Sequence, residues 1–466
     1  MTHVHMIGIG GSGLSAIARL LIERGYTVSG SDLEFSTLAQ EVQALGAEVS
    51  LGHREEHIIG ADLVIRSSAI PDDNVEVRAA LHAGIPVYKR ADYFGKLTED
   101  YTGIAVAGTH GKTTTTAMIS WMLTALGHDP SYIIGGVSTN LGNNAHAGKG
   151  SFFVIEADEY DRMFLGLHPE IAIVTNVEHD HPDCFPTAED FFQAFVDFVH
   201  RLPENGTLLA CADDYGAAKL IEVARVSGFK TLSYGVNDLT DKSSPDYTTQ
   251  NLAMDQLGNY SFEVVYQGKP LAKLALCVPG LHNASNALAA LAVAHQLNVA
   301  IAKSAQALCE FLGTGRRFEL LGEISGIAVI DDYAHHPTEI QATLAAARNR
   351  YPDSRLWAVW QPHTYSRTRA LLDEFITSFS DADHVLVTEI YASREPVDAD
   401  FSAQQVVQAM EHPDVRFLPS NRQVTDFLVT NLKKGDVLMV LSAGDANQIS
   451  KEVIESISRN GNSNNV

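Results

Sequence analysis

A phosphate-binding loop is the clearest chemical feature of the sequence. The segment GTHGKTTTT, residues 108–116, follows the apolar run TGIAVA and precedes AMISWMLTAL, whose pattern is that of a helix. Glycines let backbone N–H groups approach phosphate oxygens, and a helix start adds partial positive charge. Lys112 can reach the β- and γ-phosphates, and the Thr113 hydroxyl can bind Mg²⁺. Val106 replaces the first glycine of the common G-x-x-x-x-G-K-[ST] pattern, so the motif is the shorter G-T-H-G-K-T.

A second glycine-rich turn lies near the start of the chain. Gly8, Gly10 and Gly13 follow the strand-like run HVHMIGI in the G-x-G-x-x-G spacing, and Asp32 ends the next run, YTVSGSD. The pattern is typical of dinucleotide binding, in which the glycines admit a diphosphate and the acid accepts from a ribose hydroxyl. It would fit an NAD-dependent oxidoreductase. The triphosphate loop elsewhere argues against that interpretation, because such a turn can serve any nucleotide diphosphate.

Acidic and histidine side chains follow two further strand-like runs. The segment EADEYD, residues 156–161, comes after FFVI, and EHDHPD, residues 178–183, comes after IAIVTNV. Because the carboxyl ends of parallel strands line one crevice, we expect both segments near the phosphate loop. Carboxylates and a histidine there can hold Mg²⁺ against phosphates. The letters H-D-H-P-D also resemble a metallohydrolase motif, but that alternative leaves Lys112 and the glycine-rich loops unexplained.

Candidate ligand-binding residues continue in the second half of the chain. Asn283 and Asn286 open a helical segment, where asparagine can cap the helix or read an adenine edge. Arg317 is one of two adjacent arginines at an expected domain junction, and arginine suits phosphate recognition. The segment DDYAHHP, residues 331–337, follows the strand-like IAVI, and QPHTYSR, residues 361–367, follows LWAVW. Both are therefore expected at strand ends, where a crevice forms.

Three α/β blocks are expected to position these motifs. The first runs to about Lys96, the second opens at Tyr101 and the third starts near Gly315. Strand-like and helical segments alternate in each block, which predicts parallel sheets covered by helices. Residues 247–278 instead alternate apolar and polar side chains, which predicts an antiparallel insert, followed by a helical pair over 282–312. The polar tail SRNGNSNNV is expected to be disordered.

Composition narrows the class of protein. The chain has 466 residues, 45% hydrophobic and 19% charged, with a formal net charge of −24. So acidic a chain is not expected to bind nucleic acid, and an anionic substrate needs locally basic or metal-filled pockets. The four cysteines lie far apart, without a C-x-x-C pair, which fits a reducing cytoplasm. We see no signal peptide or membrane-spanning run, and expect a cytoplasmic protein without membrane insertion.

Taken together, the motifs resemble the Mur ligases of peptidoglycan synthesis. The resemblance runs in order from about residue 4 to 450 and rests on GIGGSGLSAIA, GSD, SSAIPDDN, GTHGKTTTT, EADEYD, TNVEHDHPD, GLHNASNALAA, GTGRRFE, DDYAHHPTEI and QPHTYSRTR. It implies an α/β fold of three domains. Residues 1–98 would form a Rossmann-like N-terminal domain that binds a UDP-sugar. Residues 99–314 would form a central P-loop ATPase domain with a mostly parallel sheet. Residues 315–466 would form a C-terminal Rossmann-like domain that contacts ATP and the amino acid.

The resemblance also implies roles for single residues. Lys112, His335 and Arg317 would be catalytic, and Thr113, Glu156 and His181 would hold Mg²⁺ or Mn²⁺. ATP would bind Gly108, Thr109, His110, Gly111, Lys112, Thr113, Thr114, Asn283, Asn286, Arg317 and Asp331. The UDP-sugar would lie along Gly10, Gly11, Ser12, Gly13, Asp32, His53, Ser67 and Ser68. The amino acid would contact His335, His363 and Arg367.

The activity implied by the resemblance is ATP-dependent amide ligation. UDP-N-acetylmuramate would supply the carboxylate, and QPHTYSRT, GIGGSGLSAIA and SSAIPDDN favour L-alanine as the amino acid. EADEYD and IGGVSTNLG are closer to the ligase that recycles murein tripeptide, which stays an alternative. Residues 183–201 contain no lysine, whereas ligases of later steps usually carry a carbamoylated lysine there. A catalytically idle nucleotide-binding regulator is a further alternative, and both a monomer and a homodimer are compatible with the sequence.

Overall fold

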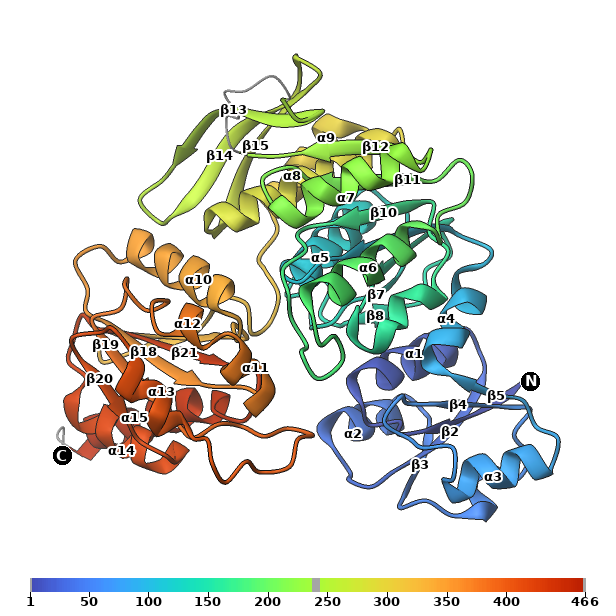
Figure 1. The fold of residues 1–466 in the computed structure, drawn as a ribbon, viewed down its shortest axis with the longest axis horizontal. Coiled ribbons are helices and arrows are strands. Elements are labelled where there is room, and N and C mark those ends of the chain that lie inside the picture. Colours follow the sequence, from blue (N-terminus) through green and yellow to red (C-terminus); the bar gives the residue numbers. More distant parts are fainter. Residues whose placement is uncertain (1, 237–243, 464–466) are drawn as a thin grey trace.

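The computed structural model of the protein describes residues 2–236 and 244–463, and side chains up to residue 459. Three β-sheets of five, ten and six strands follow one another along the chain and form three α/β units. Figure 1 shows them in an arc, with the first unit (blue) and the third (orange to red) on either side below the central one (green and yellow). The three α/β blocks expected from the sequence are therefore present.

The first unit is a parallel sheet with helices around it. Its elements are β1 (His3–Ile7), α1 (Ser12–Glu23), β2 (Thr27–Asp32), α2 (Thr37–Ala44), β3 (Glu48–Leu51), the 3₁₀ helix η1 (Glu55–Ile58), β4 (Leu63–Arg66), α3 (Val75–His82), β5 (Val87–Lys89) and α4 (Arg90–Thr98). The strand order is β3-β2-β1-β4-β5. Apolar side chains at helical spacing, such as Leu14, Ile17 and Leu21, bury one face of α1. Helix α1 therefore starts at the glycine-rich turn and packs against the sheet.

The central unit carries the phosphate loop between its first strand and helix. Its elements are β6 (Thr102–Ala107), α5 (Lys112–Ala125), β7 (Ser131–Ile133), β8 (Ala145–His146), β9 (Phe152–Glu156), the 3₁₀ segment η2 (Tyr160–Gly166), β10 (Ile171–Val174), α6 (Ala188–Val199), β11 (Thr207–Cys211), α7 (Tyr215–Val226), β12 (Lys230–Tyr234), β13 (Tyr247–Met254), β14 (Asn259–Tyr266), β15 (Lys269–Pro279), α8 (Leu281–Gln296) and α9 (Ile301–Cys309). The order is β15-β14-β13-β12-β11-β10-β6-β9-β7-β8. Because β6 lies between parallel β10 and β9, the loops after these three strands meet at one edge.

The antiparallel insert predicted over residues 247–278 is present as β13, β14 and β15. It is not a separate sheet, because Tyr247 pairs with Tyr234 of β12 and so extends the central sheet. The predicted helical pair is formed by α8 and α9, and α8 packs against α5. The insert therefore widens the central unit on the side away from β9.

The third unit is a six-stranded sheet in the order β16-β17-β21-β18-β19-β20, parallel except for β16. Its elements are β16 (Glu319–Ile324), β17 (Ile327–Asp332), α10 (Pro337–Arg350), β18 (Leu356–Gln361), α11 (Tyr365–Ala370), α12 (Leu372–Phe375), β19 (His384–Val387), α13 (Ala403–Ala409), β20 (Val415–Phe417), α14 (Asn421–Asn431), β21 (Val437–Ser442) and α15 (Asn447–Ser463). The motifs around His335 and His363 follow β17 and β18, as expected.

The C-terminal tail differs from the sequence expectation. Helix α15 runs to Ser463, so the first residues of SRNGNSNNV are helical rather than disordered. Ile449 and Val453 anchor the helix in an apolar core of the third unit. Helical hydrogen bonding then carries the helix past its last apolar contact. Residues 464–466 of this tail lie outside the described residues.

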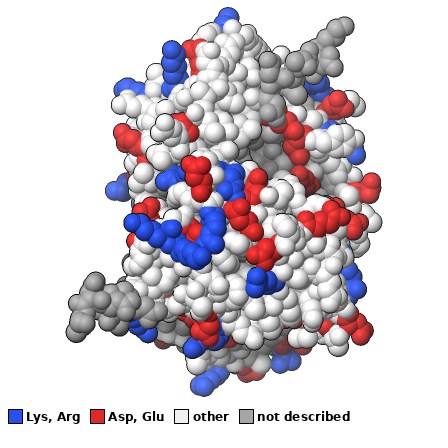
Figure 2. All heavy atoms as spheres, turned by 90° about the vertical axis from the view of Figure 1, so that its left-hand side faces the viewer, with Lys and Arg blue, Asp and Glu red and all other residues white. Residues whose placement is uncertain are grey.

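The first and central units share an apolar core, and the third unit does not belong to it. One continuous core joins the first and central units through Phe94 and Leu97 of α4, while the third unit has cores of its own. On the face drawn in Figure 2, acidic and basic side chains are interspersed. Over the described part of the chain, we find no helix with the length and apolar character needed to cross a bilayer.

Candidate active site

The phosphate loop connects β6 to α5 in a conformation that needs glycine. Gly108 has φ of 135° and Gly111 has φ of 78°. A Cβ on Gly108 would collide with the Thr175 hydroxyl, so the loop packs closely on the end of β10. No side chain caps the start of α5, which leaves its first N–H groups available. Backbone donors and a helix N-terminus together form an anion site.

Lys112 lies inside this loop in an acidic setting. Its Nζ donates to the carbonyl oxygens of Gly108 and Thr109, at 2.5 and 3.1 Å, and pairs with Glu159 Oε1 at 2.9 Å. Burial lowers the pKa of Lys112, but the carboxylates around it, Glu159 first, raise it above its ordinary value. Burial raises the pKa of Glu159 to about 7 despite this lysine. The lysine is therefore charged, and its counter-ion is a carboxylate that a phosphate can replace.

Oxygen ligands suited to a cation lie around this lysine. The Thr113 hydroxyl donates to Glu156 Oε1 at 3.1 Å, and Glu156 Oε2 accepts from the Gly135 N–H at 2.7 Å. His181 Nε2 is 3.7 Å from Glu159 Oε1. The other oxygen of Glu159, Oε2, is buried and has no hydrogen-bond partner among the described residues. Hydroxyl and carboxylate oxygens with one imidazole suit Mg²⁺ or Mn²⁺.

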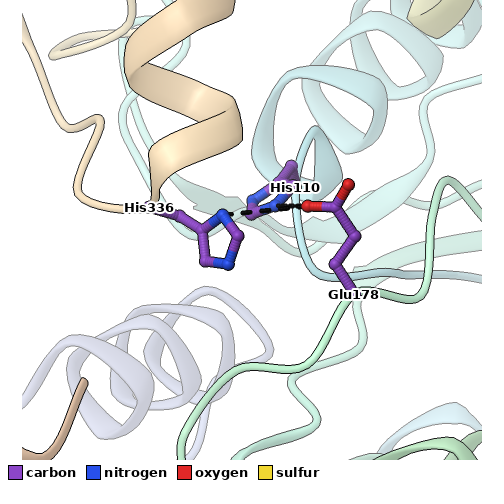
Figure 3. A group of neighbouring side chains, drawn as sticks. All are labelled: His110, Glu178 and His336. Atoms are coloured by element: carbon purple, nitrogen blue, oxygen red, sulfur yellow. Dashed lines mark hydrogen bonds and ion pairs between the residues drawn. The ribbon is translucent and has the colours of Figure 1, made fainter. Parts of the chain in front are cut away.

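His110 of the loop joins the central unit to the third. Its Nε2 lies 2.9 Å from Glu178 Oε2, and its Nδ1 lies 3.4 Å from Glu339 Oε1 on α10. Glu178 also accepts from the Thr338 hydroxyl at 2.7 Å, and His336 Nδ1 lies 3.7 Å from the same oxygen. Burial lowers the pKa of His110, but the two glutamates outweigh it and raise that pKa to about 9. Figure 3 shows the rings of His110 and His336 beside the Glu178 carboxylate.

A cavity of about 570 Å³ opens beside the loop and is lined by both the central and third units. Asn283 and Asn286 are buried in its wall on α8, and Asn286 lies against Gly111. The N-cap of α8 is Gly280, and no side chain caps that end. Neither asparagine is therefore the N-cap, but Asn283 Nδ2 donates to the Pro279 carbonyl at 2.7 Å and Asn286 Nδ2 to Asn283 Oδ1 at 3.3 Å.

Arg317 reaches this cavity from the third unit. Its NH1 donates to Glu339 Oε1 at 3.2 Å. Burial lowers the pKa of Arg317, but Glu339 and Asp332 outweigh it and raise that pKa. Asp331, in contrast, accepts from Arg316 Nε at 3.2 Å and is absent from the cavity wall, whereas Asp332 lines it. Of the two adjacent acids, Asp332 is thus the one placed to face a ligand in the cavity.

Arg367 ties the third unit to the central one at a second point. Its Nε and NH2 donate to both carboxylate oxygens of Asp180, at 2.6 and 3.2 Å, and both residues are buried. Its NH1 donates to His363 Nδ1 at 3.0 Å, and its NH2 lies 3.3 Å from His181 Nδ1. The rings of His363 and His335 are 5.9 Å apart. The three side chains predicted to contact the amino acid thus form one cluster, with Asp180 on one edge of the guanidinium.

The first unit holds its glycine-rich turn through Asp32. The Asp32 carboxylate accepts from the Gly10 N–H at 2.8 Å, and α1 begins at Ser12 immediately beyond the turn. His53 Nδ1 lies 2.9 Å from Ser31 Oγ and 3.6 Å from the buried Glu76. Ser67 and Ser68 follow β4, next to the turn. The predicted UDP-sugar residues therefore gather at the carboxyl ends of β1, β2, β3 and β4.

Three buried acids complete the site. Sequence analysis placed Glu159 and Asp180 only within segments that could hold Mg²⁺, and it gave Glu339 no role. Glu159, Asp180 and Glu339 pair with Lys112, Arg367 and Arg317 respectively. Because a buried cation needs a negative charge beside it, Lys112, Arg317 and Arg367 could have indicated that buried acids exist. The partners could not be matched, however, because Asp180 and Arg367 lie 187 positions apart.

Comparison with known proteins assigns a family to this three-unit arrangement. The Mur ligase family catalytic domain matches residues 3–102, the Mur ligase middle domain residues 106–294, and the Mur ligase glutamate ligase domain residues 316–444. A UDP-N-acetylmuramate–L-alanine ligase of Caldanaerobacter subterraneus subsp. tengcongensis is 41% identical over 455 residues, 97% of each chain.

Two solved structures share the fold over their whole length. The UDP-N-acetylmuramate-alanine ligase MurC of Thermotoga maritima gives a TM-score of 0.82 at 27% identity, covering 99% of this chain and 100% of that one. A murein peptide ligase of Psychrobacter arcticus gives 0.72 at 27% identity, covering 98% and 99%. The chain belongs to the Mur ligase family, and the predicted three-domain α/β fold is confirmed.

Proposed function

We propose that the chain is an ATP-dependent ligase that joins L-alanine to the carboxylate of UDP-N-acetylmuramate in the synthesis of peptidoglycan precursors. The observation that carries this is 41% identity to a UDP-N-acetylmuramate–L-alanine ligase over 97% of both chains. The phosphate loop and the cavity beside it support ATP as co-substrate. The murein tripeptide alternative is less favoured, since the murein peptide ligase is the less similar structure, with a TM-score of 0.72 against 0.82.

The proposed chemistry has two steps. A carboxylate does not accept an amine directly at neutral pH, because oxide is a poor leaving group. Transfer of the γ-phosphoryl group from ATP to the carboxylate gives an acyl phosphate and ADP. The amine of L-alanine then attacks the acyl carbon, phosphate leaves with the C–O bonding electrons, and the amine nitrogen loses a proton. Lys112 and Arg317 offset the anionic charge while the closed cleft aligns the reactants.

The residue roles expected from the sequence are part of this proposal. Bound Mg²⁺ would screen the phosphate charges, and Thr113, Glu156 and His181 offer ligands of the right kind. His335, His363 and Arg367 are the proposed contacts of the amino acid. The proposal also includes domain limits at residues 98 and 314 and binding of the UDP-sugar diphosphate at the N-terminus of α1. It places the reaction in the cytoplasm, where ATP and UDP-linked precursors occur. Oligomeric state stays open between monomer and homodimer.

The deciding experiment measures ADP release with UDP-N-acetylmuramate and one amine substrate at a time. We expect efficient release with L-alanine and weaker release with L-serine or glycine, because small side-chain differences change binding by about 10- to 200-fold. Little release is expected with L-Ala-γ-D-Glu-meso-diaminopimelate. If this tripeptide is the better substrate, the enzyme is a recycling ligase. No amine-dependent release with any of them would leave the regulator as the better interpretation.

Activity is expected to require Mg²⁺ or Mn²⁺ and not zinc. Two of the three ligands proposed for this role are oxygens, and their one carboxylate, Glu156, lies close enough to Lys112 to raise the pKa of that lysine, where the phosphates are expected. The measurement is ADP release after EDTA treatment, followed by addition of single metal ions. Activity that persists in EDTA, or returns with zinc alone, would contradict both the metal assignment and the ligase interpretation.

A further inference from the structure

A compact set of nitrogen and oxygen donors lies beside the phosphate loop, outside the residues proposed for Mg²⁺. Within the described residues, His110, Glu178 and His336 form the one group of at least three His, Cys, Asp or Glu whose donor atoms all lie within 4.8 Å of one another. Figure 3 shows the three side chains converging from different segments. His110 belongs to the loop, Glu178 follows β10, and His336 precedes α10. The group therefore bridges the central and third units.

We propose that His110, Glu178 and His336 bind a divalent transition-metal ion of the zinc class, which links the phosphate loop to the third unit. The donor spacing fits such an ion. Metal–ligand bonds of about 2.0–2.2 Å place neighbouring donors of a tetrahedral zinc site roughly 3.4 Å apart. The Glu178 oxygen lies 2.9 Å from His110 Nε2 and 3.7 Å from His336 Nδ1. His336 Nδ1 also accepts from the Thr338 N–H at 3.4 Å, a long capping contact that a bound ion would replace. With that exchange, small side-chain movements would bring all three donors into one coordination sphere.

The surroundings of the donors support the same assignment. A histidine that binds a metal usually donates its other ring N–H to a carboxylate, which fixes the ring and its tautomer. His110 has this arrangement, because Nε2 faces Glu178 while Nδ1 lies 3.4 Å from Glu339 Oε1. The Thr338 hydroxyl similarly orients Glu178, at 2.7 Å. His110 and Glu178 thus have the outer partners typical of metal ligands, whereas the second ring nitrogen of His336, Nε2, is buried without a hydrogen-bond partner among the described residues.

The donor set selects the kind of ion. Two imidazole nitrogens and one carboxylate suit zinc, cobalt or nickel, whereas Mg²⁺ prefers oxygen ligands. A hydrogen bond from His110 Nε2 to the Glu178 carboxylate, 2.9 Å away, needs a proton on that nitrogen, and the metal ion would take the place of this proton. Because the ligands come from two units, a bound ion would hold those units together. Zinc is therefore expected to inhibit an enzyme that must open to exchange nucleotides.

The test uses the full chain, freed of metal with a chelator and kept in millimolar Mg²⁺. Zinc is titrated in competition with a chromophoric chelator, and Co²⁺ serves as a spectroscopic probe because four-coordinate Co²⁺ absorbs strongly in the visible range. We expect one ion per chain despite the excess of Mg²⁺. Glu178→Gln and His336→Asn should each weaken zinc binding tenfold or more and abolish the Co²⁺ absorption.

The matched control is His200→Asn, which removes an exposed histidine that hydrogen-bonds to the Val196 carbonyl and packs edge-on against Phe229, away from the proposed site. It should bind zinc like the unchanged chain. Thermal melting in chelator shows whether each variant folds, and if His336→Asn does not, Glu178→Gln carries the test alone. Absence of stoichiometric binding in Mg²⁺, or equal affinity in Glu178→Gln and the control, would overturn the proposal. Neither result bears on the ligase activity, which is measured without zinc.

Discussion

Replacing Lys112 with alanine is expected to lower kcat by about 10³-fold or more while the chain still folds. Lys112 is the lysine of the phosphate loop, and its ammonium group lies between two loop carbonyls and Glu159. As the γ-phosphoryl group moves to the acceptor carboxylate, negative charge spreads over its oxygens. A fixed ammonium group in a cleft closed to water stabilises that charge far more than solvent can. ADP release with saturating substrates measures the effect.

The control for this prediction concerns Glu159, the carboxylate that pairs with Lys112. Alanine leaves Glu159 buried without its cation, so a loss of stability could imitate a loss of catalysis. Burial already raises the pKa of Glu159 to about 7, so the carboxyl can take up a proton instead of unfolding the loop. The double variant Lys112→Ala with Glu159→Gln removes both members of this ion pair, so that only the weaker interaction of Lys112 with Glu156 is lost uncompensated. It should melt like the unchanged chain and stay inactive. Near-normal amide formation by either Lys112 variant would show that the loop is misassigned.

Local patterns were sufficient to predict most of the elements. The β-branched run before Gly108 and the glycines after it predict a strand and a tight turn, because few other backbones fit that spacing. Alternation over 247–278 likewise predicts the antiparallel strands β13 to β15. What the pattern does not contain is the single pairing of Tyr234 with Tyr247, which merges the insert with the central sheet. Sheet membership depends on contacts between segments, and one sequence does not encode these as a local period.

In the candidate site, too, local sequence patterns predict which residues lie near a ligand but not which side chains they contact. His181 and His335 were predicted near ligands because strand ends meet at one edge of a sheet, and His110 because it belongs to the phosphate loop. Their partners were harder to predict. Glu339 lies in the first turn of α10, where an acid commonly stabilises the helix dipole, yet its carboxylate contacts His110 and Arg317. Asp331 and Asp332 are adjacent at the end of β17, so their side chains point to opposite faces of the sheet, and which face borders the cavity depends on how the third unit packs against the central one.

Replacing Arg367 with alanine is expected to raise the KM for L-alanine by about a hundredfold or more, with a much smaller change in the KM for ATP. The planar guanidinium suits a carboxylate, and it lies beside His363 in the cluster proposed for the amino acid. Asp180 occupies its Nε–NH2 edge, at 2.6 and 3.2 Å. An incoming carboxylate must therefore use the NH1–NH2 end and displace the contacts that this end makes with His363 and His181. Initial rates at varied L-alanine and varied ATP separate the two KM values.

Because Arg367 pairs with Asp180, the test also needs a variant that keeps a positive charge at position 367. Alanine would leave Asp180 buried and unpaired, which costs roughly 3–5 kcal/mol, and could loosen the junction between the central and third units. Arg367→Lys retains a cation for Asp180 but loses the fork that binds a carboxylate with two hydrogen bonds. It should melt close to the unchanged chain and still show the raised KM for L-alanine. If Arg367→Lys keeps that KM normal, or if both KM values rise together, Arg367 only fastens two domains together and the amino acid binds elsewhere.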